Sequence, residues 1–430
     1  MKTWTVAAFL STMSLCLGCW HVSPGDDPPG DQAPAEYYFE GKIILGSPSL
    51  TAGIPGSGPL TIDQICQWLE DPKVHQALDF TLPLGLRDAA TLIWMPPDNQ
   101  LTRAKIELGR QIFFDAQLSN HNRACALCHR PEQDYSAYMV MPRVGRNPPV
   151  CFNRIFSEHQ FWDGRANSLE DQVSDPISNP FEMGTPPEEF VANLKSIEGY
   201  QLQFDAIFGR TDMETVGFAL ASFQRALVTG PAPWDYHRLL TKFDQQKPES
   251  LSPQEKQLLE QLRAGALAYP MSESALRGEG LFFSERTKCH WCHSGPNLTD
   301  EMYHNIGVGM DLFEPDLGRF EFTKNEEDLG AFKTPTLRNI ANTPPYMHDG
   351  KFGSLIKVID WFNQGGVDHA HLDAKIQPLD LAIEDRRDLI AFLNALSGPL
   401  PPVESARLPQ ADSPEYFDNI EDLKARSYND

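Results

Sequence analysis

Two copies of the pattern Cys-x-x-Cys-His, at Cys125–His129 and Cys289–His293, constrain this chain more than any other feature. Two thiols at this spacing can form thioethers to the vinyl groups of one porphyrin, and the next residue then places its imidazole beneath the iron. A redox-active thiol pair or half of a zinc site would leave the adjacent histidine unexplained, and zinc would need two further ligands. The sequence therefore predicts two covalently attached c-type haems. Their attachment and axial residues are Cys125, Cys128 and His129, and Cys289, Cys292 and His293.

The two patterns lie at equivalent positions of an internal repeat. The first copy opens with Gly109-Arg-Gln-Ile-Phe-Phe114, and the second opens with Gly278-Glu-Gly-Leu-Phe-Phe283. Each copy closes on an apolar stretch of helical periodicity that stops at a Gly-Pro pair, Gly230-Pro231 or Gly398-Pro399. The repeat predicts a mainly α-helical fold of two tandem cytochrome c-like domains with few short strands.

Changes in composition set the expected boundaries around the repeat. We expect an N-terminal domain over residues 61–230 and a C-terminal domain over 271–398, joined by a linker (231–270) with a helix from Ser252 to Leu267. Residues 20–60 are rich in Pro, Gly and Asp and predict a flexible tether, and residues 399–430 predict a polar tail. Two cysteines fall outside the patterns and the N-terminal segment. Cys66 and Cys151 are expected to be buried small residues or, in an oxidising compartment, a disulfide.

Residues 1–19 have the pattern of an export signal. Lys2 is followed by an apolar stretch from Trp4 to Leu17, too short to span a bilayer as a mature helix, and then by Gly18-Cys19. We therefore expect a periplasmic protein, in which Cys19 is a candidate for a lipid anchor. The formal net charge of −23 argues against binding to nucleic acid. It is compatible with a basic redox partner, or simply with a solvated acidic surface.

The segments around the two patterns resemble one known family. They are Gly145-Arg-Asn-Pro-Pro-Val150, Phe161-Trp-Asp-Gly-Arg-Ala166, Leu169-Glu-Asp-Gln172, Pro176-Ile-Ser-Asn-Pro-Phe-Glu-Met183, Phe332-Lys-Thr-Pro-Thr-Leu-Arg-Asn339 and Pro345-Tyr-Met-His-Asp-Gly350. Over about residues 96–398 the chain is similar to bacterial di-haem cytochrome c peroxidases and their MauG-type relatives. The resemblance implies that the N-terminal haem meets peroxide, and that the C-terminal haem holds or relays the second oxidising equivalent.

The resemblance also implies roles for individual residues. Glu182 and Gln172 match the distal acid/base pair of the peroxide site, since cleavage of the O–O bond requires a proton to move between its two oxygens. Trp162 matches the tryptophan between the haems that relays electrons, although a core aromatic would look the same. A calcium ion near the domain interface is implied by matches at Asn147, Thr343 and Pro345.

A first departure from the family pattern concerns the N-terminal haem. Peroxidases that need reductive activation carry a distal histidine in the loop after the first pattern, but this chain has no histidine between His129 and Arg146. We therefore expect a five-coordinate N-terminal haem that is ready for peroxide without prior reduction. Ligation by Met139 or Met141 is the rival interpretation.

A second departure concerns the C-terminal haem. Phe362 stands where the family has Met in peroxidases and Tyr in the MauG type, and phenylalanine cannot bind iron. The second haem is therefore expected to be five-coordinate or to take another ligand, with His369 and His371 as the candidates.

Three functions are compatible with these features. The leading prediction is a cytochrome-c peroxidase, which reduces hydrogen peroxide with electrons from a small c-type cytochrome or copper protein. The alternative is a MauG-like oxidase that modifies a Trp or Tyr of a partner protein. A non-enzymatic two-haem electron carrier is disfavoured, because carriers normally keep both irons six-coordinate. Members of the family often form homodimers, and the same is allowed here.

Overall fold

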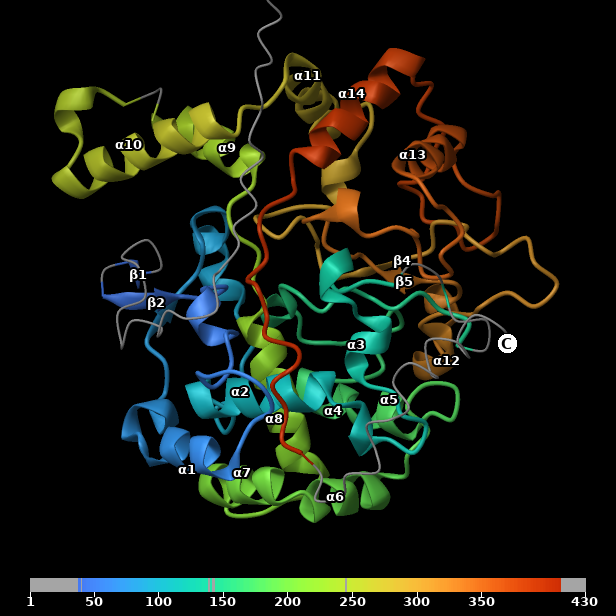
Figure 1. The fold of residues 1–430 in the computed structure, drawn as a ribbon. Helices are drawn as coiled ribbons and strands as arrows, with labels where there is room; N and C mark the ends of the chain where they lie inside the picture. Colours follow the sequence, from blue (N-terminus) through green and yellow to red (C-terminus); the bar gives the residue numbers. More distant parts are fainter. Residues whose placement is uncertain (1–37, 40, 138–139, 141–143, 244–245, 411–430) are drawn as a thin grey trace, which may run out of the picture. The chain divides into compact units, whose positions relative to one another are not determined.

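Each copy of the repeat is built on a pair of packed helices. The computed structural model describes residues 38–39, 41–137, 140, 144–243 and 246–410. In the first copy, α2 (Arg103–Phe114) packs against α8 (Met213–Ala226), and in the second copy α11 (Glu273–Phe282) packs against α14 (Ile383–Asn394) (Figure 1). The described part of the chain is mainly helical with few short strands, as predicted.

A glycine lets the two helices of each pair approach closely. A Cβ atom added to Gly109 on α2 would lie 2.0 Å from the carbonyl oxygen of Ala219 on α8. A Cβ atom added to Gly278 on α11 would lie 1.9 Å from the carbonyl oxygen of Asp388 on α14. Since both distances are far shorter than any van der Waals contact, only glycine fits at either crossing.

The aromatic side chains that follow these glycines pack in the same way in both copies. The rings of Phe113 and Phe223 are 5.2 Å apart between centroids in the first copy, and those of Phe282 and Phe392 are 5.1 Å apart in the second. Such pairs add packing energy beyond the burial of apolar area. The internal repeat seen in the sequence is therefore a repeat of three-dimensional packing.

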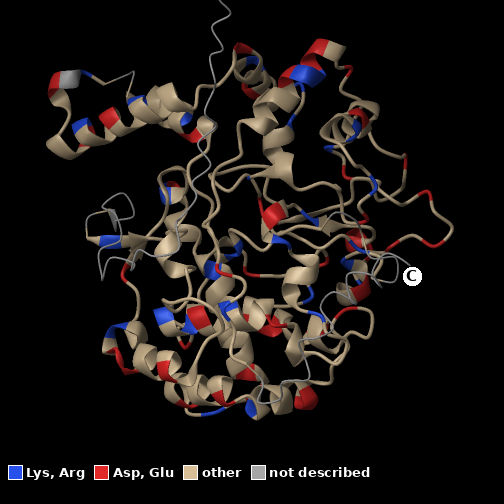
Figure 2. Cartoon of the chain, in the orientation of Figure 1, with Lys and Arg blue, Asp and Glu red and all other residues tan. Residues whose placement is uncertain are grey.

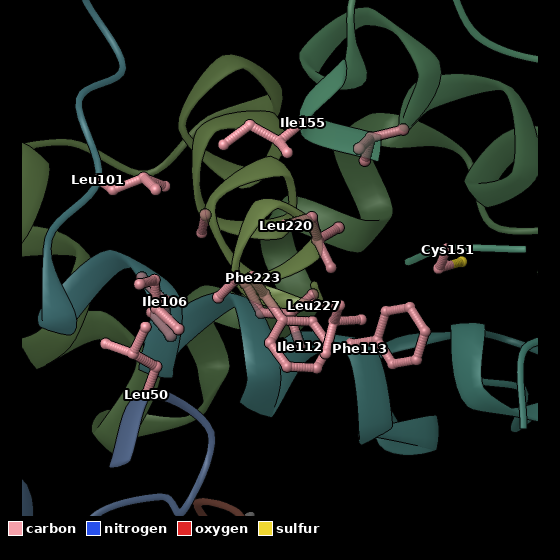
Figure 3. Close-up of a cluster of buried hydrophobic side chains, with 14 of the residues drawn as sticks. Leu50, Leu101, Ile106, Ile112, Phe113, Cys151, Ile155, Leu220, Phe223 and Leu227 are labelled. Atoms are coloured by element: carbon pink, nitrogen blue, oxygen red, sulfur yellow. The ribbon is translucent and has the colours of Figure 1, made fainter. Parts of the chain in front are cut away.

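The first copy contains most of the remaining helices. They are α1 (Ile62–Glu70), α3 (Cys125–Cys128), α4 (Leu169–Gln172), α5 (Ser174–Ser178), α6 (Pro187–Ser196) and α7 (Glu198–Phe208). Strand β2 (Lys42–Ile44) pairs antiparallel with β1 (Tyr38–Phe39) and parallel with β3 (Phe80–Thr81). Apolar side chains of α2 and α8 form the centre of the buried cluster, and the labelled members include Ile106, Phe113, Leu220 and Phe223 (Figure 3).

The second copy has a separate, smaller buried cluster. Besides α11 and α14 it contains α12 (Phe320–Thr323), α13 (Leu355–Gln364) and the antiparallel pair β4 (Tyr303–His304) and β5 (Phe332–Lys333). The cluster includes Phe282, Leu298 and Phe392. Each copy therefore buries its own apolar residues around its own helix pair.

The linker between the copies forms two helices. The expected helix is present as α10 (Pro253–Ala268), and it begins where Ser252 and Glu255 form a capping box. A further helix, α9 (Pro233–Phe243), precedes it and lies against it at the upper left of Figure 1. The pairing is supported by the stacked rings of Tyr236 and Tyr269, whose centroids are 6.2 Å apart.

The structure corrects the predicted tether at its C-terminal end. Residues 42–60 belong to the fold, because Leu45 is fully buried and Leu50 is 5% exposed in the first cluster. The segment is rich in Gly and Pro, and this composition predicts a tether although the segment contains a few apolar residues that become buried. Residues 20–37 and 40 lie outside the described residues.

The predicted polar tail is also partly folded. The Arg407 side chain is buried and donates hydrogen bonds to the carbonyl oxygens of Ile54 (3.1 Å) and Gly58 (2.7 Å). Residues 399–410 therefore return to the first copy, whereas 411–430 lie outside the described residues.

The two copies meet at the ends of their closing helices, and a buried ion pair joins the linker to the second copy. The amide of Gly230 donates a hydrogen bond to the carbonyl oxygen of Pro399 at 2.7 Å. The guanidinium of Arg338 in the second copy donates to both carboxylate oxygens of Asp235 on α9, at 2.6 and 2.8 Å, and both side chains are almost completely buried. A buried pair of this kind is costly to break, because either partner alone would be an uncompensated charge.

Cys66 and Cys151, the described cysteines outside the two patterns, are free thiols. Cys151 is buried, as expected, and Cys66 is half-buried. Cys16, Cys19 and the rest of the predicted export signal lie outside the described residues. Among the helices that the structure describes, none is long and apolar enough to cross a membrane.

Candidate functional site

One cavity of about 860 Å³ extends between the two Cys-x-x-Cys-His patterns. Its walls include Cys128 and His129 from the first copy and Cys292 and His293 from the second. Large cofactors are bound in cavities of this size class, which are mostly apolar with a few placed polar groups. Both predicted axial histidines and three of the four predicted attachment cysteines therefore face a common space.

The axial histidines are oriented in the manner of metal ligands. Nδ1 of His129 lies 3.3 Å from the carbonyl oxygen of Tyr135, and Nδ1 of His293 lies 3.1 Å from the carbonyl oxygen of Leu298. A histidine that donates from Nδ1 to a carbonyl keeps Nε2 as a lone-pair donor for a metal. Burial lowers the pKa of His129 to about 4 and also lowers the pKa of His293, so both rings are neutral. These residues fit haem iron.

The structure brings a second set of possible metal ligands together beside the second pattern. Ligand atoms of Cys292, Asp300 and His304 lie within 4.8 Å of one another. However, the His304 ring lies between two carboxylates, at 2.9 Å from Asp300 and 2.6 Å from Asp373. Both ring nitrogens are therefore engaged by carboxylates, and hydrogen bonds, first to Asp300 and then to the Cys292 thiol, raise the pKa of His304 to about 10. The zinc alternative therefore gains no support.

Glu182 and Gln172 lie in the same cavity as His129. Gln172 is the last residue of α4, and Glu182 follows α5 by a short turn. Both also line a smaller cavity of about 70 Å³ together with Cys125 and His129. The structure thus places the predicted acid/base pair next to the first haem-attachment pattern.

The carboxyl group of Glu182 is held by a neighbour that the sequence analysis did not single out. Nδ2 of Asn179 donates a hydrogen bond to Oε1 of Glu182 at 2.8 Å. Burial raises the pKa of Glu182, while this hydrogen bond and the charge of Arg165 oppose the rise and the charge of Asp175 adds to it. Asn179 stands three residues before Glu182 within one family-like segment, and that spacing was the available signal.

Trp162 bridges the two copies at the cavity wall. Its indole Nε1 donates to the carbonyl oxygen of Asn147 at 2.7 Å, and its own carbonyl oxygen accepts from the amide of Lys333 at 2.7 Å. Asn147 belongs to the first copy and Lys333 to the second. The indole is therefore held in the wall of the cavity that both patterns line, and its predicted role as an electron relay stays a prediction.

The three residues predicted to bind calcium are also close to this space. Asn147, Thr343 and Pro345 all line the cavity, and Nδ2 of Asn147 donates to the carbonyl oxygen of Pro345 at 2.7 Å. The Oδ1 atom of Asn147 is buried and has no hydrogen-bond partner within the described part of the chain. A rotation of this amide would turn Oδ1 towards the same carbonyl, and two such oxygens suit a hard cation. The residues fit calcium.

The remaining predicted ligands can be placed only in part. Phe362 on α13 lines the cavity together with Leu355, Val358 and Ile359 of the same helix, and the segment that follows α13 adds Lys375 and Gln377 to the lining. His369 and His371 are not among the lining residues, and their rings contact each other at 5.6 Å. Met139 and Met141 lie outside the described residues.

Comparisons with known proteins agree with this geometry. A family model described as di-haem cytochrome c peroxidase matches residues 103–242. The methylamine utilization protein MauG of Methylorubrum extorquens is 35% identical over 73% of this chain and 84% of its own. The cytochrome c551 peroxidase of Pseudomonas aeruginosa is 30% identical over 77% of this chain and 93% of its own.

Solved structures show the same fold. A MauG-like protein associated with microbial copper homeostasis matches with a TM-score of 0.60 and 26% identity, over 71% of this chain and 93% of its own. The diheme peroxidase BthA of Burkholderia thailandensis matches with a TM-score of 0.57 and 20% identity, over 73% and 91%. The chain therefore belongs to the di-haem cytochrome c peroxidase and MauG family.

Proposed function

We propose that this protein is a cytochrome-c peroxidase, which reduces hydrogen peroxide to water with electrons from a small c-type cytochrome or copper protein. The observation that carries the proposal is the half-buried carboxyl group of Glu182, which lines the same cavity as His129. Each turnover takes two electrons and two protons and converts one peroxide molecule into two water molecules. Membership of a family that contains cytochrome c peroxidases supports the same reaction.

The side chains of this cavity supply proton transfer and electron relay. Haem bound at the two patterns would supply iron redox chemistry. Glu182 accepts a proton from one oxygen of peroxide and returns it to the other, so that the second oxygen leaves as water. Asn179 holds the carboxyl group in place, and the Gln172 amide is positioned to hydrogen-bond peroxide. Trp162 relays electrons from the second copy to the first.

The carboxyl group of Glu182 gives the sharpest test. In Glu182→Gln the side chain keeps its size but loses its proton acceptor, so we expect the turnover number for peroxide to fall by about 10²- to 10⁴-fold. The assay is the steady-state oxidation of a reduced small-molecule donor by the protein carrying both haems, with the Soret absorbance as the check on haem content. The matched control is Glu188→Gln, an exposed carboxylate on α6. Equal rates in all three proteins would refute the role of Glu182.

The missing distal histidine leads to a second expectation. We propose that the first haem is open to peroxide in the fully oxidised protein, because no histidine stands between His129 and Arg146. The oxidised protein should therefore react with peroxide without a lag. A long lag that reductant removes would contradict the proposal.

A MauG-like oxidation of a partner protein is the second candidate. It is favoured by the similarity to MauG proteins, of which two are 35% and 33% identical to this chain. It is disfavoured by Phe362, at the position where the family resemblance places a tyrosine. Rapid oxidation of a reduced cytochrome by peroxide supports the peroxidase. Slow turnover, together with covalent change in Trp or Tyr of an added protein, supports the oxidase.

A calcium ion is proposed as a structural partner of the cavity. Asn147, Thr343 and Pro345 would hold it with side-chain and carbonyl oxygens. The ion would replace the missing partner of Asn147 Oδ1. Removal of calcium with a chelator should change the fluorescence of nearby Trp162, and Asn147→Ala should abolish that response.

Export to the periplasm is proposed from residues 1–19 alone. The chain made with its own N-terminus should be processed near Gly18-Cys19, and mass spectrometry of the mature N-terminus tests this. A lipidated Cys19 would show as a mass increase on the first residue. An intact Met1 in the haem-loaded protein would refute export.

A further inference from the structure

We propose that the loop from Gly309 to Gly318, called the Phe313 loop below, is the docking site for a small basic redox protein that delivers electrons to the cavity. The inference rests on the proposed function and deepens it, because it locates the surface where the donor binds. Four features of the loop support the inference: its tip is exposed, its stem is held by hydrogen bonds, its segment is acidic, and part of it lines the cavity.

The tip of the Phe313 loop carries two exposed apolar side chains. Phe313 is 98% exposed and the adjacent Leu312 is 59% exposed. Figure 1 shows the loop between β4 and α12 extending outwards at the right of the view. An aromatic side chain that becomes buried when a partner binds often anchors the complex.

The stem of the loop is fixed, so the tip is presented in a defined position. Asp316 accepts hydrogen bonds from Nε and Nη2 of Arg146 at 2.6 and 2.7 Å, and also from the amide of Gly318 at 2.9 Å. The amide of Leu312 donates to the carbonyl oxygen of Gly309 at 3.2 Å. A partner that binds Phe313 therefore has little loop entropy to overcome.

The segment that contains the loop is acidic, and residues 326–330 lie beside the end of the loop, where the amide of Gly330 donates to the carbonyl oxygen of Leu317 at 2.9 Å. Residues 300–330 contain nine Asp or Glu and two Lys or Arg, and the acidic positions of the loop are red in Figure 2. Glu314, Glu326 and Glu327 are exposed, and no basic side chain of the described residues forms an ion pair with them. A second copy of this chain, with the same acidic surface and a net charge of −23, would be repelled. A small protein with a lysine-rich face would be attracted and steered.

The loop also connects the docking surface to the electron relay. Glu314, Pro315 and Asp316 line the same cavity as Trp162. Arg146 bonds Asp316 on one side and, through Nη1 at 2.6 Å, Asp163 on the other, and Asp163 is bonded in sequence to Trp162. A short route of hydrogen bonds and covalent bonds thus leads from the loop to the indole. Two docked donors, each oxidised by one electron, supply the two electrons that one peroxide molecule consumes.

Steady-state kinetics with two donors test the proposal. The probes are a reduced, lysine-rich mitochondrial cytochrome c and the small donor tetramethyl-p-phenylenediamine, both with the protein carrying its two haems. For Phe313→Ser we expect the KM for cytochrome c to rise by about fivefold or more, since an anchor residue is lost. For the double variant Glu326→Gln and Glu327→Gln we expect kcat/KM to fall by about threefold at low salt and to depend less on salt.

Matched controls separate docking from general damage. Leu267→Ser removes an 84% exposed apolar side chain from α10, and Glu249→Gln with Glu260→Gln removes two acidic charges from the linker. Both controls should leave the kinetics with cytochrome c unchanged. An unchanged KM in Phe313→Ser, an equal effect of the controls, or a wild-type protein that uses the small donor but not cytochrome c would each overturn the docking proposal. Failure of the wild-type protein with both donors would instead overturn the proposed peroxidase function.

Discussion

The two copies of the repeat share a scaffold and differ in what lines their part of the cavity. In both, the helix pair crosses at a glycine, a phenylalanine of the opening helix packs against one of the closing helix, and a histidine Nδ1 lies near a carbonyl oxygen. Near the first histidine the lining includes Glu182, Gln172 and Asn179, whereas the residues of α13 that line the cavity in the second copy, Leu355, Val358, Ile359 and Phe362, are all apolar.

This difference teaches where function is encoded in such a repeat. The helix pair fixes the position of each cofactor, and the segments between the histidine and the closing helix set the chemistry. In the first copy these segments line the cavity with Glu182 and Gln172. In the second copy they contribute the apolar residues around Phe362 together with charged and polar ones such as Asp316 and Lys375.

Loss of one pair of haem-attachment cysteines should have the largest effect on peroxidase activity, and it should reveal the different roles of the two copies. The double variants Cys125→Ser with Cys128→Ser, and Cys289→Ser with Cys292→Ser, should each lose one of the two covalent haems and nearly all peroxidase activity. Haem per chain, measured as the pyridine haemochrome, checks the first point. Only the variant that keeps the first pattern should still respond to peroxide in its Soret band. The same response from both variants would contradict the division of roles.

Substitution of the glycine at the helix crossing should destabilise both copies to a similar extent. Gly109→Ala and Gly278→Ala place a methyl group against a backbone carbonyl, so each should lower the free energy of unfolding by about 1–3 kcal/mol or more. The control is Gly280→Ala on α11, where an added Cβ meets nothing within 4 Å. It should stabilise the protein by about 0.5–1 kcal/mol through helix propensity. Denaturant titrations measure all three, and a cost at only one crossing would show that the copies are packed differently.

The hydrogen bond from Asn179 should set the pH dependence of the first copy. Its Nδ2–H group stabilises the ionised form of Glu182, which opposes the rise in pKa that burial causes. In Asn179→Ala the pKa of Glu182 should therefore rise further. Because the ionised carboxylate accepts the proton from peroxide, activity is lost as the pH falls through this pKa, and the acid limb of the profile should move to higher pH. Asn193→Ala, which removes a bond to the carbonyl oxygen of Leu118, serves as the control.

Phe362 should give the smallest effect on rate and the clearest spectroscopic one. If its side chain faces the second haem, Phe362→Met offers a thioether ligand and should convert one high-spin ferric centre into a low-spin centre. Electron paramagnetic resonance of the oxidised protein measures this change. Phe352→Met, in the same copy but outside the cavity lining, should leave the spectrum unchanged. An unaltered spectrum in Phe362→Met would mean that another residue occupies the sixth position.

The features predicted best from the sequence are those with a local signal. The two haem patterns, the glycine and phenylalanine pairs of the repeat, and the capped helix that starts after Ser252 are each readable within about a dozen residues. Family resemblance added Glu182, Gln172 and Trp162, which the structure brings to the same cavity.

The features missed are those whose partners are distant in sequence. No pattern around Arg338 indicates that its partner is Asp235 or that Arg407 returns to Ile54, because such contacts arise only when the chain folds. The predicted tether is too long at its C-terminal end for a related reason. Leu45 ends a run of only three apolar residues and Leu50 stands alone in a Gly- and Pro-rich segment, and their burial depends on a surface provided by the rest of the first copy.

The buried contact between Arg338 and Asp235 has a consequence for how this protein is assembled. Arg338 belongs to the second copy and Asp235 to the linker, and neither charge is accessible to water. If the chain is cut after Gly230, the C-terminal fragment contains both Asp235 and Arg338, and the ion pair can form within it. If the chain is cut after α10, Asp235 lies on one fragment and Arg338 on the other, and each charge lacks its partner. We therefore expect that any fragment, circular permutant or domain-exchanged chain that still folds will keep helix α9 together with the second copy.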